Sequence, residues 1–206
     1  MPFSTPDLIA AGLAYLLGSL SFAVIVSKAL ALPDPKSYGS GNPGATNVLR
    51  SGSKKAAILT LLGDTLKGVV AVLLAKHFAA QFGITEAGVA LVAVAVFLGH
   101  LFPIFFGFKG GKGVATAAGV LFALDWRIGL ALLAIWALVF AVTRVSSMAA
   151  IIGSALAPVF AFYFYGAKPI FWAALVMTVL LIYRHKANIE RMISGHEDSF
   201  KKKPAG

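Results

Sequence analysis

The sequence predicts an all-α fold, a polytopic membrane helix bundle with about seven transmembrane helices, its N-terminus outside and its C-terminus in the cytoplasm. Three observations lead to this prediction. Hydrophobic residues make up 59% of the 206 residues and charged residues only 13%, about half the charged share of a typical soluble domain. The mean hydropathy is +0.85. The apolar residues form long runs, and the basic residues gather in alternate loops.

Seven apolar segments are expected to form the helices: residues 7–32, 56–80, 86–106, 113–124, 128–143, 147–165 and 169–183. The first segment lacks the basic start and short apolar core of a signal peptide, so we expect it to be retained. The fourth and fifth are short against the ~20 residues that cross a bilayer. A five-span alternative, in which those two form a re-entrant pair, therefore stays open. No repeat or domain boundary interrupts the chain, and residues 1–206 are expected to form a single integral-membrane domain.

The distribution of basic residues predicts the orientation. If the first helix starts outside, one set of loops contains Lys36, Arg50, Lys54, Lys55, Lys109, Lys112, Arg144, Arg184, Lys186, Arg191 and residues 201–203. Only Arg127 and Lys168 fall into the opposite loops, with Lys76 near that face. This bias places the basic side in the cytoplasm. The net charge of +10 is therefore attributed to orientation and anionic headgroups, and we expect no nucleic-acid partner.

The inventory of reactive side chains excludes several chemistries. The chain has no cysteine, and its four histidines lack metal-ligand spacing, so we expect neither a metal nor another cofactor. No serine lies in a Gly-x-Ser-x-Gly elbow, and no covalent nucleophile can be assigned. The His-x-x-x-x-Asp pattern of the common glycerolipid acyltransferases is also missing.

The first polar segment reads YGSGNPGATNVLR, from Tyr38 to Arg50. Its G-x-G-x-x-G spacing does not indicate a dinucleotide site, because a helix of membrane length precedes it instead of a strand. A flexible glycine turn is one interpretation. An oxyanion site is the other, formed by Ser40, Gly41, Asn42, Thr46, Asn47 and Arg50.

The second polar segment reads FKGGKGVAT and contains Gly110, Gly111, Lys112 and Gly113. It is not a Walker A loop, because Lys112 stands where that motif requires glycine. Glycine nevertheless lets backbone amides approach an anion, and the positive end of the next predicted helix follows directly. A snorkelling lysine in a flexible turn is the alternative.

The third polar segment, YRHKANIERMISGHEDSF, follows the last apolar run. Helical spacing places His185 and Asn188 on one face, with Arg191 one turn further on. An ordinary solvated chain end would look similar. Within the second predicted helix, Asp64 and Lys67 are spaced i, i+3, and we expect them to pair.

Together, a glycine loop, Arg50 and Lys112 at one membrane surface suit phosphate, and the apolar surroundings suit an acyl chain. A transporter or channel for organophosphate anions would use similar groups, but it would need a water path to both faces. The polar segments gather at one face only, and the two halves show no inverted repeat. A lipid-binding scaffold would not explain three separate oxyanion-type segments.

The three segments resemble those of the acyl-phosphate-dependent glycerol-3-phosphate acyltransferases of bacterial membranes, the PlsY family. The resemblance rests on the motifs at 39–50, 99–116 and 185–197. It implies acyl transfer from acyl phosphate to the 1-hydroxyl of sn-glycerol 3-phosphate, giving lysophosphatidate and phosphate. It also implies a multi-pass protein of the bacterial inner membrane among membrane lipids, with its active site facing the cytoplasm. Transient contact with the soluble enzyme that makes acyl phosphate is a further implication.

Position by position, the resemblance implies that Ser40 and Arg50 hold phosphate and that Lys112, with the amides of Gly110, Gly111 and Gly113, forms the glycerol-phosphate loop. His185 and Asn188 would position the substrate or the reacting carbonyl, and Glu197 would be structural. The leaving group of acyl phosphate is weakly basic, so charge stabilisation and proximity should carry much of the rate. His185 and a substrate phosphate oxygen remain two candidates for the general base.

Overall fold

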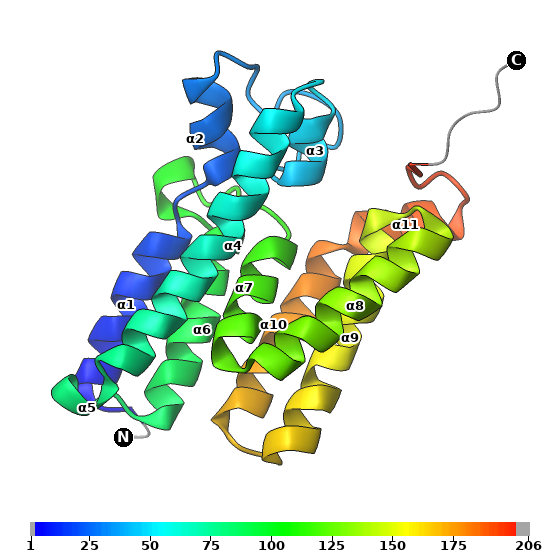
Figure 1. Cartoon of the computed structure of the whole chain (residues 1–206). Coiled ribbons are helices and arrows are strands. Elements are labelled where there is room, and N and C mark those ends of the chain that lie inside the picture. Colours follow the sequence, from blue (N-terminus) through cyan, green and yellow to red (C-terminus); the bar gives the residue numbers. More distant parts are fainter. Residues whose placement is uncertain (1–2, 201–206) are drawn as a thin grey trace, which may run out of the picture.

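The protein is an all-helical bundle in the computed structural model, which describes residues 3–200 (Figure 1). Its elements are α1 (Thr5–Gly18), α2 (Phe22–Ala29), α3 (Ala45–Leu49), α4 (Lys54–His77), α5 (Ala79–Phe82), α6 (Glu86–Leu101), the 3-10 turn η1 (Ile104–Phe106), α7 (Val114–Leu124), α8 (Trp126–Thr143), α9 (Ser146–Tyr165), α10 (Pro169–Arg184) and α11 (Lys186–Ile193). No strand occurs among these described residues. The all-α prediction is confirmed.

All seven predicted apolar segments are helical, but they differ in length. Within residues 3–200, five stretches are long and apolar enough to cross a membrane: Thr5–Ala29, Lys54–His77, Glu86–Phe106, Trp126–Thr143 and Ser146–Tyr165. The bent pair α10 and α11, which meet at 55°, is a candidate sixth. The helix α7 has only 11 residues, or about 16 Å at 1.5 Å per residue. A multi-helix membrane bundle is therefore supported, while seven full spans and the direction of insertion stay predictions.

The helices form two groups that meet at α7 (Figure 1). The first group contains α1, α4 and α6, and the second contains α8, α9 and α10. Successive long helices run in opposite directions, so the segments after α2, after α6 and after α10 all lie at the upper end of the view. The three polar segments are thus at one end of the bundle, as their alternation in sequence predicts.

Small residues dominate the contacts between helices, while large apolar side chains point outward. Gly18 of α1 lies so close to α6 that an added Cβ would be 2.1 Å from the carbonyl oxygen of Val96. In contrast, Leu138 and Val142 of α8 are 66% and 72% exposed. Close backbone packing with an apolar exterior is typical of helices in lipid, where apolar side chains gain nothing by facing inward.

The first predicted helix, 7–32, is broken between α1 and α2, which corrects the expectation of one continuous helix. The hydroxyl of Ser19 donates to the carbonyl of Tyr15, 2.9 Å away, a bond that competes with the helix and bends it. The break frees the carbonyl of Leu20, and the Lys67 ammonium donates to it at 2.7 Å. A polar group inside the bundle is thereby satisfied, as a low-dielectric interior requires.

The predicted pair of Asp64 and Lys67 is confirmed, with 2.9 Å between Oδ1 and Nζ. His100 of α6 joins it, since its Nδ1 lies 3.5 Å from the same carboxylate oxygen. The hydroxyl of Thr116 on α7 donates to the carbonyl of Asp64 at 2.9 Å. These buried polar contacts hold α4, α6 and α7 together directly beneath the second polar segment.

Candidate active site

The three polar segments are joined by specific side-chain contacts. The Lys112 ammonium, from the second segment, donates to Oδ1 of Asn188 in the third. The Arg50 guanidinium, from the first, pairs with Asp198 at 2.6 Å. The Lys36 ammonium, just ahead of the first segment, donates to the carbonyl of Phe106 at 3.3 Å. Residues more than 140 positions apart in the chain therefore form one polar cluster.

The glycine loop that carries Lys112 is clamped on both sides. The amides of Gly110 and Gly111 each donate at 3.2 Å to the last carbonyls of α6, those of Leu101 and His100. The carbonyls of the same two glycines accept from Arg184, at 2.8 Å from Nη2 and 3.2 Å from Nε. These two amides are thus bonded within the protein in this structure, and their expected role in binding phosphate stays a prediction.

Glycine is required in this loop by close approach as well as by backbone conformation. A Cβ on Gly111 would lie 2.3 Å from Nε2 of His100. Gly113 has φ +89°, a value that favours glycine, and α7 begins at the next residue. The loop thus turns tightly from α6 into α7 and leaves Lys112 as the cationic group that it presents to the third segment.

The environment of Lys112 lowers the pKa of its ammonium to about 8. Burial is the main cause, since it disfavours the charged form, and the guanidinium groups of Arg191, Arg184 and Arg50 act in the same direction. The carboxylate of Glu197 opposes them. Lys112 is therefore mostly protonated at neutral pH and close to its titration range.

Glu197 organises the third segment. Its Oε1 accepts hydrogen bonds from Asn188 Nδ2 and, at 2.6 Å, from the Ser147 hydroxyl, while its Oε2 accepts from Arg191 at 2.8 Å. Burial alone would raise the pKa of this carboxyl, but the three hydrogen bonds hold the pKa below its ordinary value. The carboxylate orients the Asn188 amide, so that Oδ1 of Asn188 faces Lys112. The structural role expected for Glu197 stays a prediction.

His185 lies at the bend between α10 and α11 and is buried. Its Nδ1 is 2.8 Å from the carbonyl oxygen of Leu181. Because a carbonyl can only accept, Nδ1 carries the proton, and Nε2 of the neutral ring is left as an acceptor. That tautomer is the one that a general base needs.

In the first segment, Asn47 holds the loop. Its Oδ1 accepts from the Ser40 amide at 3.0 Å, and its Nδ2 donates to the carbonyls of Pro35 and Tyr38 at 2.7 and 3.2 Å. A Cβ on Gly39, which has φ +59°, would lie 2.3 Å from Asn47 Oδ1. The Asn47 side chain is therefore bonded to its own loop in this structure.

The other predicted groups of the first segment remain accessible. Ser40, Gly41 and Thr46 are exposed, and Asn42 is half-buried. The Arg50 side chain is 35% exposed, and its partner Asp198 is 71% exposed. An anion that approached Arg50 would meet a solvent-accessible ion pair that it could replace.

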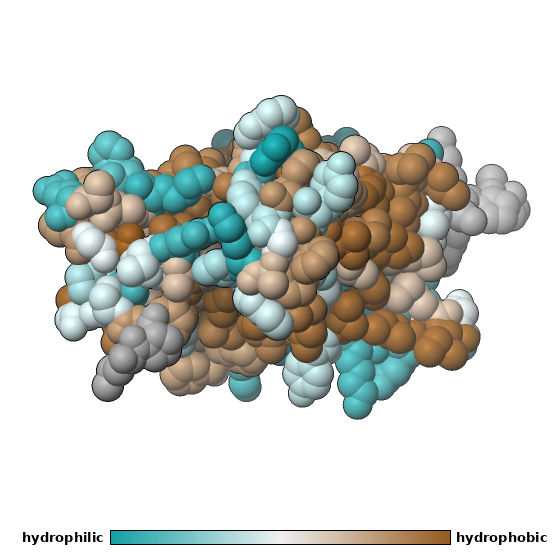
Figure 2. Space-filling model, turned by 90° about the horizontal axis from the view of Figure 1, so that it is seen from below, coloured by the Kyte–Doolittle hydropathy of each residue, from teal (hydrophilic) through white to brown (hydrophobic). Residues whose placement is uncertain are grey.

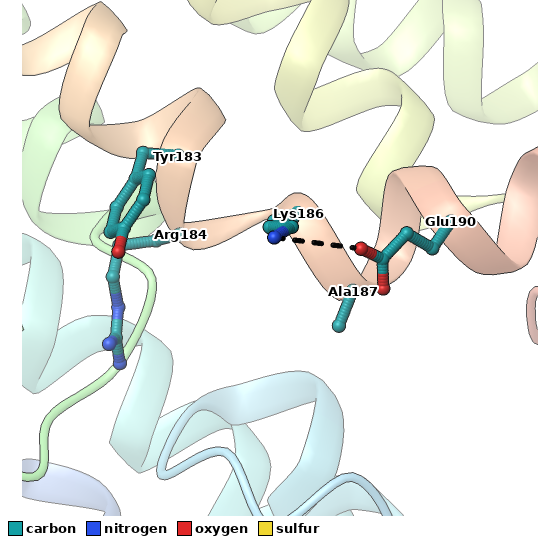
Figure 3. A pocket seen from close by; sticks show the side chains of 5 residues that line it. All are labelled: Tyr183, Arg184, Lys186, Ala187 and Glu190. Carbon is teal, nitrogen blue, oxygen red and sulfur yellow. Dashed lines mark ion pairs between the residues drawn. The ribbon is translucent and has the colours of Figure 1, made fainter.

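A hollow of about 400 Å³ lies beside this cluster, at the bend between α10 and α11 (Figure 3). Its lining consists of Tyr183, Arg184, Lys186, Ala187 and Glu190. Figure 3 shows the Arg184 side chain extending away from α10, toward the loop that precedes α7. The hollow therefore opens next to the glycine loop, and Arg184 connects the two.

Sequence reasoning missed three contributors to this cluster. Arg184 was counted only as an orientation charge, although its place directly before His185 was a signal. Ser147 had no assigned role, and Asp198 stood in a segment that also fits a solvated end.

Within residues 3–200, no group of three His, Asp or Glu side chains could hold a metal ion.

Comparison with known proteins shows the family of the chain. Residues 8–195 match the family described as Glycerol-3-phosphate acyltransferase. A glycerol-3-phosphate acyltransferase of Cupriavidus metallidurans is 59% identical over 93% of this chain and 95% of its own. One from Thiobacillus denitrificans is 60% identical over 89% and 92%.

A solved structure has a similar fold. The crystal structure of PlsY, an integral membrane glycerol 3-phosphate acyltransferase, in its glycerol 3-phosphate form is 40% identical, with a TM-score of 0.88 over 95% of this chain and 96% of that chain. Its lysophosphatidic acid form gives a TM-score of 0.86 over 95% of both chains. The family match covers residues 8–195, and the chain belongs to the glycerol-3-phosphate acyltransferase family.

Proposed function

We propose that this protein transfers a fatty acyl group from acyl phosphate to the 1-hydroxyl of sn-glycerol 3-phosphate, and that lysophosphatidate and inorganic phosphate are the products. The observation that carries the proposal is the contact of Lys112 with Asn188, within a cluster that also contains Arg50 and His185. Membership in the family and the glycerol 3-phosphate and lysophosphatidic acid forms of the related PlsY structures support it.

The cluster has the groups that the reaction needs. Lys112 would bind the phosphate of glycerol 3-phosphate in exchange for its contact with Asn188, and Arg50 and Ser40 would hold the phosphate of the donor. Positive charges near the leaving phosphate stabilise the charge that develops there. Holding both substrates at one membrane surface removes most of the entropic cost of their encounter.

The chemical step is a nucleophilic acyl substitution. The 1-hydroxyl oxygen bonds to the acyl carbonyl carbon, the bond from that carbon to the phosphate oxygen breaks, and inorganic phosphate leaves. The hydroxyl proton goes to Nε2 of His185 or to a phosphate oxygen of the substrate. Acyl phosphate is the donor that suits this site, because its leaving group needs no strong general acid.

The same reasoning supports a location in the bacterial inner membrane, with the three polar segments in the cytoplasm. Glycerol 3-phosphate would then enter from the aqueous side through the hollow at Arg184, and acyl phosphate from the membrane or from the soluble enzyme that produces it. The excess of basic residues in the segments at this end supports that orientation.

The direct test incubates the purified protein with acyl phosphate and glycerol 3-phosphate and measures lysophosphatidate and released phosphate. The two products should form in equal amounts and exceed a heat-killed control. Absence of product would refute the proposal, and flux of organophosphate across vesicles without turnover would favour a transporter instead. Retention of most turnover by His185→Ala would exclude His185 as the sole base and leave the substrate phosphate.

A further inference from the structure

A second hollow lies at the end of the bundle opposite the polar segments, where the short helix α7 stops. It has a volume of about 530 Å³. One part of its lining is apolar and comes from Val69 and Leu73 of α4, Phe122 of α7 and Trp126 of α8. Figure 2 shows the molecule from this end, with hydrophilic patches set among apolar side chains. The hollow therefore combines apolar walls with a polar rim.

The polar rim contains a buried carboxylate with two close donors. Asp125 is only 6% exposed and accepts from Nη2 of Arg127 at 2.6 Å, from Nε at 3.1 Å and from the Tyr165 hydroxyl at 2.6 Å. The Arg127 guanidinium also lies over the Phe164 ring, 4.3 Å from its centroid. Arg127 is thus fixed in place while its side chain stays 46% exposed.

Lys76, near the end of α4, is the second cation of the hollow. Its ammonium donates to the carbonyls of Ala123 and Leu124, each at 3.1 Å, which are the last two residues of α7. An ammonium has three N–H donors, so one remains. The bonds of Arg127 to Asp125 use Nε and Nη2, and the Arg127 side chain is 46% exposed. Donors at two cations are therefore available to a ligand.

The charges of the rim indicate which ligand fits. Lys76 and Arg127 contribute two positive charges against the one negative charge of Asp125, which leaves a net charge of +1. The methyl end of a substrate acyl chain, arriving along α7, would meet these charged groups and satisfy none of them. A phosphodiester carries one negative charge and accepts hydrogen bonds from both cations.

We propose that this hollow is a phospholipid-binding site, in which the phosphodiester contacts Lys76 and Arg127 and an acyl chain lies against Val69, Leu73 and Phe122. The bound lipid would fill the space that α7 leaves because it is too short to reach this end of the bundle. The site is separate from the acyltransferase cluster and does not depend on the reaction assigned to that cluster.

The test measures lipid binding to the full chain, purified in an uncharged detergent and depleted of lipid, by native mass spectrometry. Phosphatidylglycerol is compared with diacylglycerol, which has acyl chains but no phosphate. Lys76→Gln keeps a donor for the α7 carbonyls and removes the charge. We expect this variant to bind phosphatidylglycerol roughly fivefold more weakly, because one basic residue at a membrane surface contributes about 1 kcal/mol to binding. Diacylglycerol binding should stay weak in both proteins.

Lys168→Gln is the matched control, because Lys168 is an exposed lysine at the same end that does not line the hollow. Its binding of phosphatidylglycerol should equal that of the unchanged protein. Arg127→Lys provides a second variant that keeps a cation beside Asp125 but loses the several N–H donors of the guanidinium, and it should also bind phosphatidylglycerol more weakly. Equal binding of both lipids, or equal losses in Lys76→Gln and Lys168→Gln, would overturn the proposal. A changed acyl-chain preference of the reaction with unchanged phosphatidylglycerol binding would assign the hollow to the substrate tail.

Discussion

Replacement of Arg184 tests whether the clamp on the glycine loop positions Lys112. Arg184 uses two nitrogens to bond two successive carbonyls, those of Gly110 and Gly111. Lysine has a single point charge in place of this fork, so Arg184→Lys should retain the charge and lose one of the two bonds. Arg184→Gln should lose the charge and weaken both. We expect the KM for glycerol 3-phosphate to rise in both variants, and more in Arg184→Gln.

The magnitude follows from the type of bond. A hydrogen bond to a charged group contributes about 1.5–3 kcal/mol, and each 1.4 kcal/mol is a tenfold change. Loss of one bond in Arg184→Lys therefore predicts a roughly 10- to 100-fold lower kcat/KM for glycerol 3-phosphate. The KM for acyl phosphate should change far less, because the loop is assigned to the other substrate.

The pH profile separates positioning from general destabilisation. Arg184 is one of the charges that lower the pKa of Lys112 to about 8. Arg184→Gln removes that charge, so the alkaline limb of kcat/KM should move to higher pH, whereas Arg184→Lys should leave it in place. Lys55→Gln removes an exposed cation that does not line the hollow at Arg184, and this control should behave like the unchanged enzyme. Equal effects on the KM values of both substrates, with no shift of the limb in Arg184→Gln, would refute the positioning role.

Four further outcomes are expected from the same site. In the unchanged enzyme, kcat/KM for glycerol 3-phosphate should fall about tenfold per pH unit above pH 8, because Lys112 loses its proton there; a flat profile up to pH 10 would contradict this. Glu197→Gln removes a charge that raises the pKa of Lys112. The alkaline limb of its kcat/KM profile should therefore move to lower pH, in the direction opposite to that of Arg184→Gln. Asp198→Asn releases Arg50 from an exposed ion pair worth at most about 1 kcal/mol, so it should lower the KM for acyl phosphate by no more than roughly fivefold. The control Asp34→Asn should leave that KM unchanged. Finally, a chelator should leave turnover unchanged, and activity that disappears and returns with Mg²⁺ would contradict the metal-free mechanism.

The general organisation of this protein was accessible from its sequence. Long apolar runs predict helices, and alternation of the loops predicts that the motifs at 38–50, 108–116 and 183–200 share one end, as the fold shows. The pair of Asp64 and Lys67 was also predictable, because residues spaced i, i+3 on a helix are neighbours whatever the rest of the chain does.

The remaining features depend on contacts between distant segments, which spacing along the chain cannot reveal. The break between α1 and α2 leaves the carbonyl of Leu20 to accept a hydrogen bond from Lys67. No residue near Leu20 in the sequence indicates that partner. The amides of Gly110 and Gly111 were expected to face an anion, but the end of α6 offers free carbonyls at the same place. The helices and the pair of Asp64 and Lys67 were therefore predictable from periodicity, whereas contacts with a partner on another helix were not.

The position of Glu197 has a consequence for the biogenesis of the enzyme. Glu197 orients Asn188 and also accepts hydrogen bonds from Ser147 and Arg191, yet in the order of synthesis it follows all the apolar helices found within residues 3–200. The loop that carries Lys112 and the helix α11 that carries Asn188 are both synthesised before this carboxylate. Because Asn188 is not oriented until Glu197 has been synthesised, the nascent chain should be inactive during insertion. Acyl transfer would begin only after the last of these apolar helices has been inserted.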